Sequence, residues 1–265
     1  MAFNVWVTLS RHVSLFIKRN QINSQTTKAM SSVSNHNEVN VRELWRTADA
    51  VCFDVDSTVC KDEGLDELAE FCGAGAEVRE WTNKAMGGDV TFREALTQRL
   101  NIVKPSQQQL EAFITSRPPQ LTDGIKDLVS LLHSKNVPVF LVSGGFRNII
   151  EPAAKILNIP LENVYANKLL FKDGLYDGFD PKEPTSDSGG KQKVAELLKQ
   201  TYGFKCLIMI GDGATDMEAA PPADAFIGFG GNVVREKVKK NAKWFVTDFK
   251  ELIKPLQEPQ KNDLL

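Results

Sequence analysis

Four aspartates occur in two short groups whose spacing suits metal-assisted chemistry. Asp54 and Asp56 stand two positions apart, directly after an apolar run. If extended geometry persists there, both carboxylates point to the same side, and two like charges so close need a cation or a shared proton. Asp212 and Asp216 follow a second apolar run, Cys206–Ile210. Because these ligands are oxygens without histidine, the pattern favours Mg²⁺ over zinc.

Further residues suit the binding of a phosphate beside these carboxylates. A carboxylate can attack phosphorus and form an aspartyl-phosphate that water then cleaves. A phosphate dianion approaching Asp54 is repelled unless other groups neutralise it. Ser143 with the backbone N–H groups of Gly144 and Gly145 can form an anion-binding nest, and Lys191 can supply a point charge from the start of a helix. The sequence therefore predicts a phosphoryl-transfer site.

The composition argues against several other kinds of protein. With 32 Lys+Arg and 34 Asp+Glu in 265 residues, the formal charge is −2, which lacks the positive excess of nucleic-acid binders. Only three histidines are present, and two of them, His12 and His36, lie in a polar leader, so His133 is the one candidate for histidine-based catalysis or zinc binding. Four cysteines without C-x-x-C spacing predict reduced thiols. No apolar run reaches the roughly 18 residues of a membrane span.

Apolar runs alternate with helical patterns along the globular part. We expect strands at Val51–Val55, Val137–Val142, Cys206–Ile210, Ala225–Phe229 and Trp244–Val246, and helices at Ile149–Leu157, Lys191–Tyr202, Val233–Lys239 and Phe249–Leu256. This alternation predicts parallel βαβ units in a Rossmann-like three-layer α/β/α sheet. Ligands of such sheets bind beyond the carboxyl ends of the strands. The candidate residues at 54, 143 and 212 all stand at such ends.

Two insertions interrupt this core. Asp54 and Ser143 are 89 positions apart (143 − 54), whereas a crossover helix needs only about a dozen residues. The excess is helical in pattern and predicts a helical cap at 61–121, between core segments 38–60 and 122–257. Lys172-Asp173-Gly174 between apolar flanks predicts a small β-hairpin flap. Residues 258–265 are expected to be a tail.

The first 37 residues differ in composition from the rest. They contain no Asp or Glu, four basic residues and six serines, and acidic residues become frequent only from Glu38. An acid-free, Ser-rich, potentially amphipathic leader is typical of an organelle transit peptide, and a tail of chance composition is the alternative. A plastid is our expectation, with the mitochondrion or cytosol as alternatives.

Four motifs in order resemble those of the haloacid-dehalogenase-like phosphatases: Asp54-Val55-Asp56-Ser57-Thr58, Ser143-Gly144-Gly145, Lys191, and Gly211-Asp212-Gly213-Ala214-Thr215-Asp216. The resemblance extends to the phosphoserine-specific branch of that family, including its plant organellar forms, through Glu63-Gly64, Met86-Gly87-Gly88, Phe92, Arg99 and Phe229-Gly230-Gly231-Asn232. It covers residues 44–256.

The resemblance implies a role for each matched residue. Asp54 is expected to attack phosphorus, and Asp56 to act as general acid and then general base. Mg²⁺ is expected on Asp54, the backbone carbonyl of Asp56 and Asp212, with Asp216 in support. The expected phosphate-binding residues are Ser143, Gly144, Gly145 and Lys191.

The implied reaction is hydrolysis of O-phospho-L-serine to L-serine and phosphate, the last step of phosphorylated serine biosynthesis. Such a substrate carries an ammonium and a carboxylate, which Glu63 and Arg99 can pair with. Both residues lie in the expected cap, so specificity would be assembled when the cap closes. The remaining expected substrate contacts are Met86, Gly87, Phe92, Thr215 and Arg235.

Two other functions stay open from the sequence. A sibling phosphatase would act on another small phosphomonoester, and a substrate panel would reveal it. A catalytically silent phosphoserine-binding protein would not need two adjacent carboxylates, so the pair at 54 and 56 argues against it. We expect no nucleic-acid partner and no membrane contact. The sequence does not distinguish a monomer from a homodimer.

Overall fold

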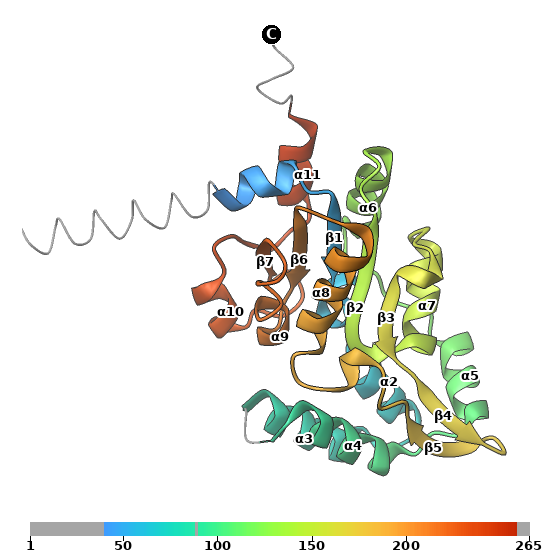
Figure 1. Ribbon diagram of the computed structural model, residues 1–265. Helices are drawn as coiled ribbons and strands as arrows, with labels where there is room; N and C mark the ends of the chain where they lie inside the picture. The colour runs from blue at the N-terminus through green and yellow to red at the C-terminus, as the bar shows by residue number, and fades with distance from the viewer. Residues whose placement is uncertain (1–39, 88–89, 259–265) are drawn as a thin grey trace, which may run out of the picture. The chain divides into compact units, whose positions relative to one another are not determined.

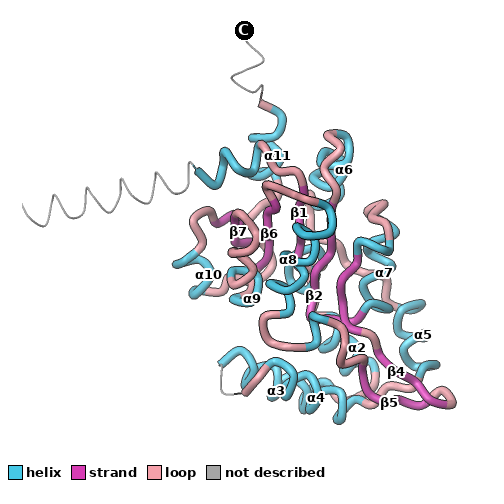
Figure 2. The backbone as a smooth tube through the Cα atoms, viewed as in Figure 1, coloured by secondary structure: helices cyan, strands magenta, loops and turns pink. Residues whose placement is uncertain are grey.

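A six-stranded parallel sheet forms the centre of the fold. The computed structural model describes residues 40–87 and 90–258. The strands lie in the order β3-β2-β1-β6-β7-β8, and every neighbouring pair is parallel (Figures 1 and 2). The strands are β1 (Ala50–Phe53), β2 (Val139–Phe146), β3 (Val164–Asn167), β6 (Leu207–Gly211), β7 (Ala225–Phe229) and β8 (Phe245–Val246). The predicted parallel α/β core is confirmed.

Helices cover both faces of this sheet because its strands are apolar on both sides. Val51 and Phe53 of β1 belong to one apolar cluster, whereas Ala50 and Cys52 belong to another, as the alternation of a strand requires. The first face carries α6 (Ile125–Ser134), α7 (Arg147–Ile156) and α11 (Lys250–Gln257). The second face carries α8 (Gly190–Tyr202), the segment from α9 (Ala214–Met217) to Ala223, and α10 (Glu236–Asn241).

Four helices and a hairpin make up a third apolar cluster at the carboxyl end of the sheet. The helices follow β1 in sequence and lie below the sheet in Figure 1, and they are α2 (Gly64–Phe71), α3 (Gly75–Gly87), α4 (Phe92–Val103) and α5 (Gln107–Ser116). The antiparallel hairpin of β4 (Leu169–Lys172) and β5 (Leu175–Phe179) packs with them. Leu68, Leu96 and Leu100 are fully buried in this cluster. The boundaries 61–121 for a cap remain a prediction.

Two differences from the expected elements bear on the site. β2 continues to Phe146, so Ser143–Gly145 lie within a strand that changes register there. The expected helix at Val233–Lys239 exists as α10, but its expected start is wrong, because α10 begins only at Glu236 and Val233 and Val234 are exposed in the preceding loop. Short turns also occur at η1 (Val55–Val59), η2 (Leu161–Asn163) and η3 (Pro184–Ser186).

The remaining expectations concern cysteines, membrane spans and the termini. All four cysteines are unpaired. Within the described ranges, no helix has the length and apolar character needed to cross a bilayer. The expected transit peptide at 1–37 lies outside the described residues, as does all but the first residue of the expected tail.

Candidate active site

The chain turns sharply after β1, and the first two aspartates of the site stand at the start of this turn. β1 ends at Phe53, and residues 55–59 wind into η1, in which Ser57 has a left-handed backbone with φ of 55°. The strand itself does not continue through the Asp-x-Asp pair, but both aspartates keep extended backbone angles and both line the same cavity. The Asp54 side chain meets Lys191, whereas that of Asp56 bonds to Gly64.

Three buried aspartates converge at the carboxyl end of the sheet. Oxygens of Asp54, Asp212 and Asp216 all lie within 4.8 Å of one another. They come from the end of β1, the end of β6 and α9, three elements that the parallel sheet brings together. Burial, and then the charge of Asp54, raise the pKa values of Asp212 and Asp216 above the ordinary range. A set of oxygen ligands with excess negative charge fits a hard divalent cation.

Lys191 neutralises part of this charge from the first turn of α8. Its Nζ lies 2.7 Å from Oδ1 of Asp54 and 2.6 Å from Oδ1 of Asp216. Burial alone would lower the pKa of Lys191, but Asp216 and Asp54 outweigh burial and raise it. The side chain is 9% exposed, so this lysine is held in place by two carboxylates. It is not the solvated lysine that is common in a first helical turn.

Arg235 joins the aspartate cluster to the start of the cap segment. Its Nε donates to Oδ2 of Asp212 at 2.6 Å, and its Nη2 lies 3.2 Å from Oε1 of Glu63. The hydroxyl of Ser57 also donates to Glu63, at 2.8 Å, and that of Thr58 donates to Asp212 at 3.2 Å. Arg235 thus pairs with Asp212 and Glu63, as Lys191 pairs with Asp54 and Asp216.

Asp56 has the environment of a proton donor. Its Oδ1 accepts the backbone N–H of Gly64 at 2.8 Å, and its Oδ2 accepts the hydroxyl of Ser143 at 3.4 Å. Burial, followed by the charges of Glu63 and Asp54, raises the pKa of Asp56 to about 7. A carboxyl group with such a pKa can donate a proton and take one back near neutral pH.

Two glycines let the Ser143 strand approach its neighbours closely. A Cβ on Gly145 would lie 2.8 Å from Oδ2 of Asp56, and a Cβ on Gly144 would lie 2.6 Å from the Phe92 ring. A larger residue at either position would therefore push Asp56 or the Phe92 ring away. The N–H of Gly145 donates to Oγ of Ser143 at 2.9 Å.

A cavity of about 520 Å³ contains most of the predicted site residues. Its walls include the core residues Asp54, Asp56, Gly144, Gly145, Lys191, Asp212, Thr215 and Arg235 and, from the expected cap, Glu63, Phe92 and Arg99. The guanidinium of Arg99 is half-buried, its Nη1 lies 3.4 Å from Oγ1 of Thr82, and burial lowers its pKa. Ser143 and Asp216 are fully buried behind the cavity wall. The expectations for the side chains of Met86 and Gly87 lie outside the described part of the chain.

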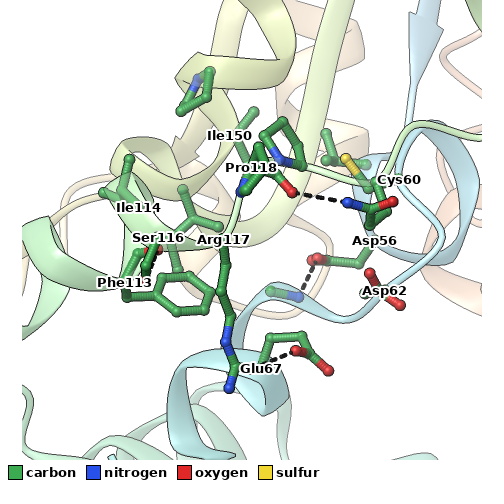
Figure 3. Close-up of a pocket in the computed structure, with 16 residues that line it drawn as sticks. Asp56, Cys60, Asp62, Glu67, Phe113, Ile114, Ser116, Arg117, Pro118 and Ile150 are labelled. Atoms are coloured by element: carbon green, nitrogen blue, oxygen red, sulfur yellow. Dashed lines mark hydrogen bonds and ion pairs between the residues drawn. The ribbon is translucent and has the colours of Figure 1, made fainter. Parts of the chain in front are cut away.

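A second cavity of about 400 Å³ lies on another side of Asp56, where the expected cap joins the core (Figure 3). Lys61 N–H donates to the Gln120 carbonyl at 2.8 Å, so the two connecting segments run side by side. Apolar side chains of Phe113, Ile114 and Ile150 line the cavity. The two connections between the expected cap and the core thus meet next to Asp56.

Several residues of the site were not anticipated from the sequence. Thr58 and Ser57 belong to the first motif, but their partners Asp212 and Glu63 depend on the turn at η1. Asn167 and Thr185 are buried and bonded to each other beneath Gly144. The sequence offers one signal for Asn167, because it ends an apolar run as Asp54 and Ser143 do. Nothing in the sequence marks Thr185.

Comparison with known proteins connects this geometry to a family. A model of the haloacid dehalogenase-like hydrolases matches residues 48–224. The chain belongs to this family. The family's matched region contains the aspartate cluster, Lys191 and the Ser143–Gly145 strand.

Three relatives of this hydrolase share most of its length. A phosphoserine phosphatase of Homo sapiens is 59% identical over 225 residues, which are 84% of this chain and 99% of that protein. A chloroplastic phosphoserine phosphatase of Arabidopsis thaliana is 53% identical over 219 residues, 82% of this chain and 74% of that protein. A solved structure described as a phospho-aspartyl intermediate analogue of phosphoserine phosphatase is 25% identical, with a TM-score of 0.69 over 79% of this chain and 99% of that one.

Proposed function

We propose that this hydrolase is a Mg²⁺-dependent phosphoserine phosphatase, which converts O-phospho-L-serine to L-serine and phosphate as the last step of phosphorylated serine biosynthesis. The observation that carries the proposal is the pairing of a buried aspartate cluster with a separate carboxyl, Asp56, whose pKa of about 7 suits proton transfer. The 59% identity to a phosphoserine phosphatase supports the choice of substrate.

In the proposed reaction an oxygen of Asp54 attacks phosphorus, and the bond between phosphorus and the seryl oxygen breaks. Asp56 gives its proton to the departing seryl oxygen. It then takes a proton from water as that water attacks the phosphoryl group and releases Asp54. Ser143, Gly144, Gly145 and Lys191 would hold the phosphoryl oxygens. Gly145 N–H and Lys191 Nζ must exchange their present partners for the ligand in this step.

The proposed Mg²⁺ ligands are Asp54, the backbone carbonyl of Asp56, and Asp212, with Asp216 in support. Asp54, Asp212 and Asp216 fit a divalent cation, because their oxygens lie within 4.8 Å of one another and offer oxygen donors only. When bound, Mg²⁺ would offset the carboxylate charge and polarise the phosphoryl group.

The serine moiety would be recognised by residues of the expected cap. Glu63 would pair with the substrate ammonium and Arg99 with its carboxylate, while Phe92, Thr215 and Arg235 line the same cavity. Glu63 pairs with Arg235, so ammonium binding would compete with that ion pair. Met86 and Gly87 complete the proposed set. The proposed cap comprises residues 61–121 and the core 38–60 with 122–257.

A panel of phosphomonoesters, assayed with and without Mg²⁺, tests this function. The proposal expects O-phosphoserine to be hydrolysed faster than sugar phosphates, nucleotides and phosphoethanolamine, and only with the metal. A preference for a sugar phosphate or a nucleotide would instead indicate a sibling phosphatase. Binding of phosphoserine without phosphate release would indicate a silent binding protein.

We further propose that residues 1–37 direct the protein to a plastid. The leader's composition and the chloroplastic relative support this, whereas mammalian relatives of similar identity support no particular organelle. A fluorescent protein fused to residues 1–40 should accumulate in plastids. Accumulation in mitochondria or in the cytosol would contradict the proposal.

A further inference from the structure

We propose that Asn167 is a positioning residue that sets the orientation of the Ser143–Gly145 strand for phosphate binding, and that Thr185 holds Asn167 in place. This inference deepens the proposed function and rests on it. Neither residue belongs to the four sequence motifs that supply the proposed catalytic and phosphate-binding groups. Asn167 ends β3 and is fully buried, and Thr185 lies in η3 with 3% exposure.

The backbone ladder between β2 and β3 is interrupted where the phosphate would bind. Val142 pairs with Tyr165, but the next pair along the strands is Phe146 with Asn167, so the register shifts across residues 143–145. A side chain fills this interruption. Nδ2 of Asn167 donates to the carbonyl of Gly144 at 2.8 Å. The asparagine amide therefore supplies a bond that a regular ladder would have supplied.

The bond to Gly144 also fixes the direction of the next N–H group. In a planar trans peptide, the carbonyl of one residue and the N–H of the following residue point in opposite directions. Holding the Gly144 carbonyl toward Asn167 therefore turns the Gly145 N–H toward Oγ of Ser143, to which it donates at 2.9 Å. The Ser143 hydroxyl in turn donates to Asp56 at 3.4 Å. Asn167 thus orients the proposed phosphate-binding groups without touching the cavity.

Thr185 connects the same asparagine to the segment that leads into Lys191. Its hydroxyl donates to Oδ1 of Asn167 at 3.0 Å, and its carbonyl lies 3.4 Å from Nδ2 of Asn167. η3 packs tightly on the start of α8. A Cβ placed on Gly190 would lie only 2.3 Å from the Pro184 carbonyl, so only glycine allows this approach. One buried amide therefore links the Ser143–Gly145 strand to the helix that carries Lys191.

The alternative is that Asn167 and Thr185 only stabilise the fold. The affinity for phosphate distinguishes this alternative from a positioning role. Loss of a buried hydrogen bond lowers stability wherever the bond lies. For Asn167, which does not line the cavity, only a positioning role predicts weaker binding of inorganic phosphate by the folded protein. Asn163 offers a matched control, because its Nδ2 donates to the Val139 carbonyl at 3.0 Å, at the opposite end of β2.

The test measures binding of inorganic phosphate to the full chain with Mg²⁺ by titration calorimetry, together with thermal unfolding. For Asn167→Ala and Thr185→Val we expect the dissociation constant to rise about tenfold, roughly 1.4 kcal/mol. For Thr185→Ser, which keeps the hydroxyl, and for Asn163→Ala, we expect a change below about twofold, even where Asn163→Ala lowers the unfolding temperature.

Unchanged phosphate affinity in folded Asn167→Ala or Thr185→Val would overturn the inference. If Asn167→Ala does not fold, Thr185→Val against Thr185→Ser decides alone, since the first keeps the shape of threonine without its hydroxyl and the second keeps the hydroxyl and loses only a methyl group. A wild-type protein that binds phosphate but does not hydrolyse O-phosphoserine contradicts the proposed function and leaves the calorimetric comparison valid. A wild-type protein that does not bind phosphate contradicts both.

Discussion

Asp56 and Gly64 are joined by a hydrogen bond of 2.8 Å, in which the first N–H of α2 donates to the carboxyl group of the proposed general acid. A Cβ on Gly64 would lie 3.3 Å from that same carboxyl oxygen and 3.2 Å from Ile149, so the approach is close on both sides. The protonation of Asp56 is therefore coupled to the position of the first helix of the expected cap.

Replacing Asp56 by Asn should nearly abolish turnover without unfolding the protein. Asparagine keeps an oxygen that accepts the Gly64 N–H, but it cannot transfer a proton, so kcat should fall by about 10²–10⁴. Phosphate release from O-phosphoserine and thermal unfolding measure the two effects. A kcat within about tenfold of wild type would remove Asp56 from the role of acid and base.

The stability of the metal-free protein should decrease as pH rises toward neutrality. Burial raises the pKa of Asp56 from 3.8 to about 7, and it also raises those of Asp212 and Asp216. The folded protein therefore binds more protons than the unfolded chain across this window, and proton release on raising the pH favours unfolding. Mg²⁺ should relieve the same repulsion, so it should raise the unfolding temperature more at pH 8 than at pH 5.

The comparison needs four unfolding temperatures, measured at pH 5 and at pH 8, each with Mg²⁺ and with a chelator. Asp212→Asn serves as the control, because it removes one proposed ligand and should reduce the Mg²⁺ effect at both pH values. An equal Mg²⁺ effect at pH 5 and pH 8 in wild type would mean that the cation does not relieve this carboxylate repulsion.

Replacing Arg99 by Ala should reduce the preference for O-phosphoserine over phosphoethanolamine. Phosphoethanolamine lacks the carboxylate that Arg99 is proposed to bind, so only phosphoserine loses a charged contact, and the ratio of kcat/KM values should fall by about 10 to 100-fold. Arg93→Ala is a suitable control. Arg93 lies on the same helix but pairs with Asp187 instead, so its loss should leave the ratio unchanged. An unchanged ratio in Arg99→Ala would count against carboxylate recognition by this residue.

Replacing Arg235 by Ala should strengthen Mg²⁺ binding in the absence of substrate. Arg235 donates to Asp212 at 2.6 Å, so its positive charge competes with a cation for that carboxylate. We expect the Mg²⁺ dissociation constant to fall about threefold or more and the KM for O-phosphoserine to rise, because the residue also lines the substrate cavity. Calorimetric Mg²⁺ titration measures the first effect. Weaker Mg²⁺ binding in the variant would show that Arg235 orders Asp212 more than it competes for it.

The sequence predicts the parallel core well because strand ends and motifs coincide. Asp54, Ser143 and Asp212 each follow an apolar run, and the rule that parallel strands share a carboxyl edge brings them together without further information. Lys191 is predictable as a motif residue, but its burial between two carboxylates is not, because that depends on how α8 docks on the sheet.

The sequence does not predict geometry that depends on local breaks in regular structure. The left-handed turn at Ser57 brings its hydroxyl to Glu63, and the register shift in β2 creates the position that Asn167 fills. The apolar periodicity at Val233 and Val234 predicts a helix, yet these residues are exposed and lie in an irregular loop. This loop leads directly into Arg235. Each irregular segment bonds to a distant part of the chain: the Ser57 carbonyl accepts from Asn232, the Gly144 carbonyl accepts from Asn167, and Arg235 donates to Asp212.

The most direct measurement of the central claim is the identity of the phosphorylated residue during turnover. The full chain would be mixed with O-phosphoserine and Mg²⁺, quenched in acid within the first turnover, and analysed by peptide mass spectrometry, with Asp54→Asn as reference. We expect one phosphoryl group on Asp54 in wild type and none in Asp54→Asn. Phosphate release by wild type with the phosphoryl group on another residue, or substantial turnover by Asp54→Asn, would contradict the account.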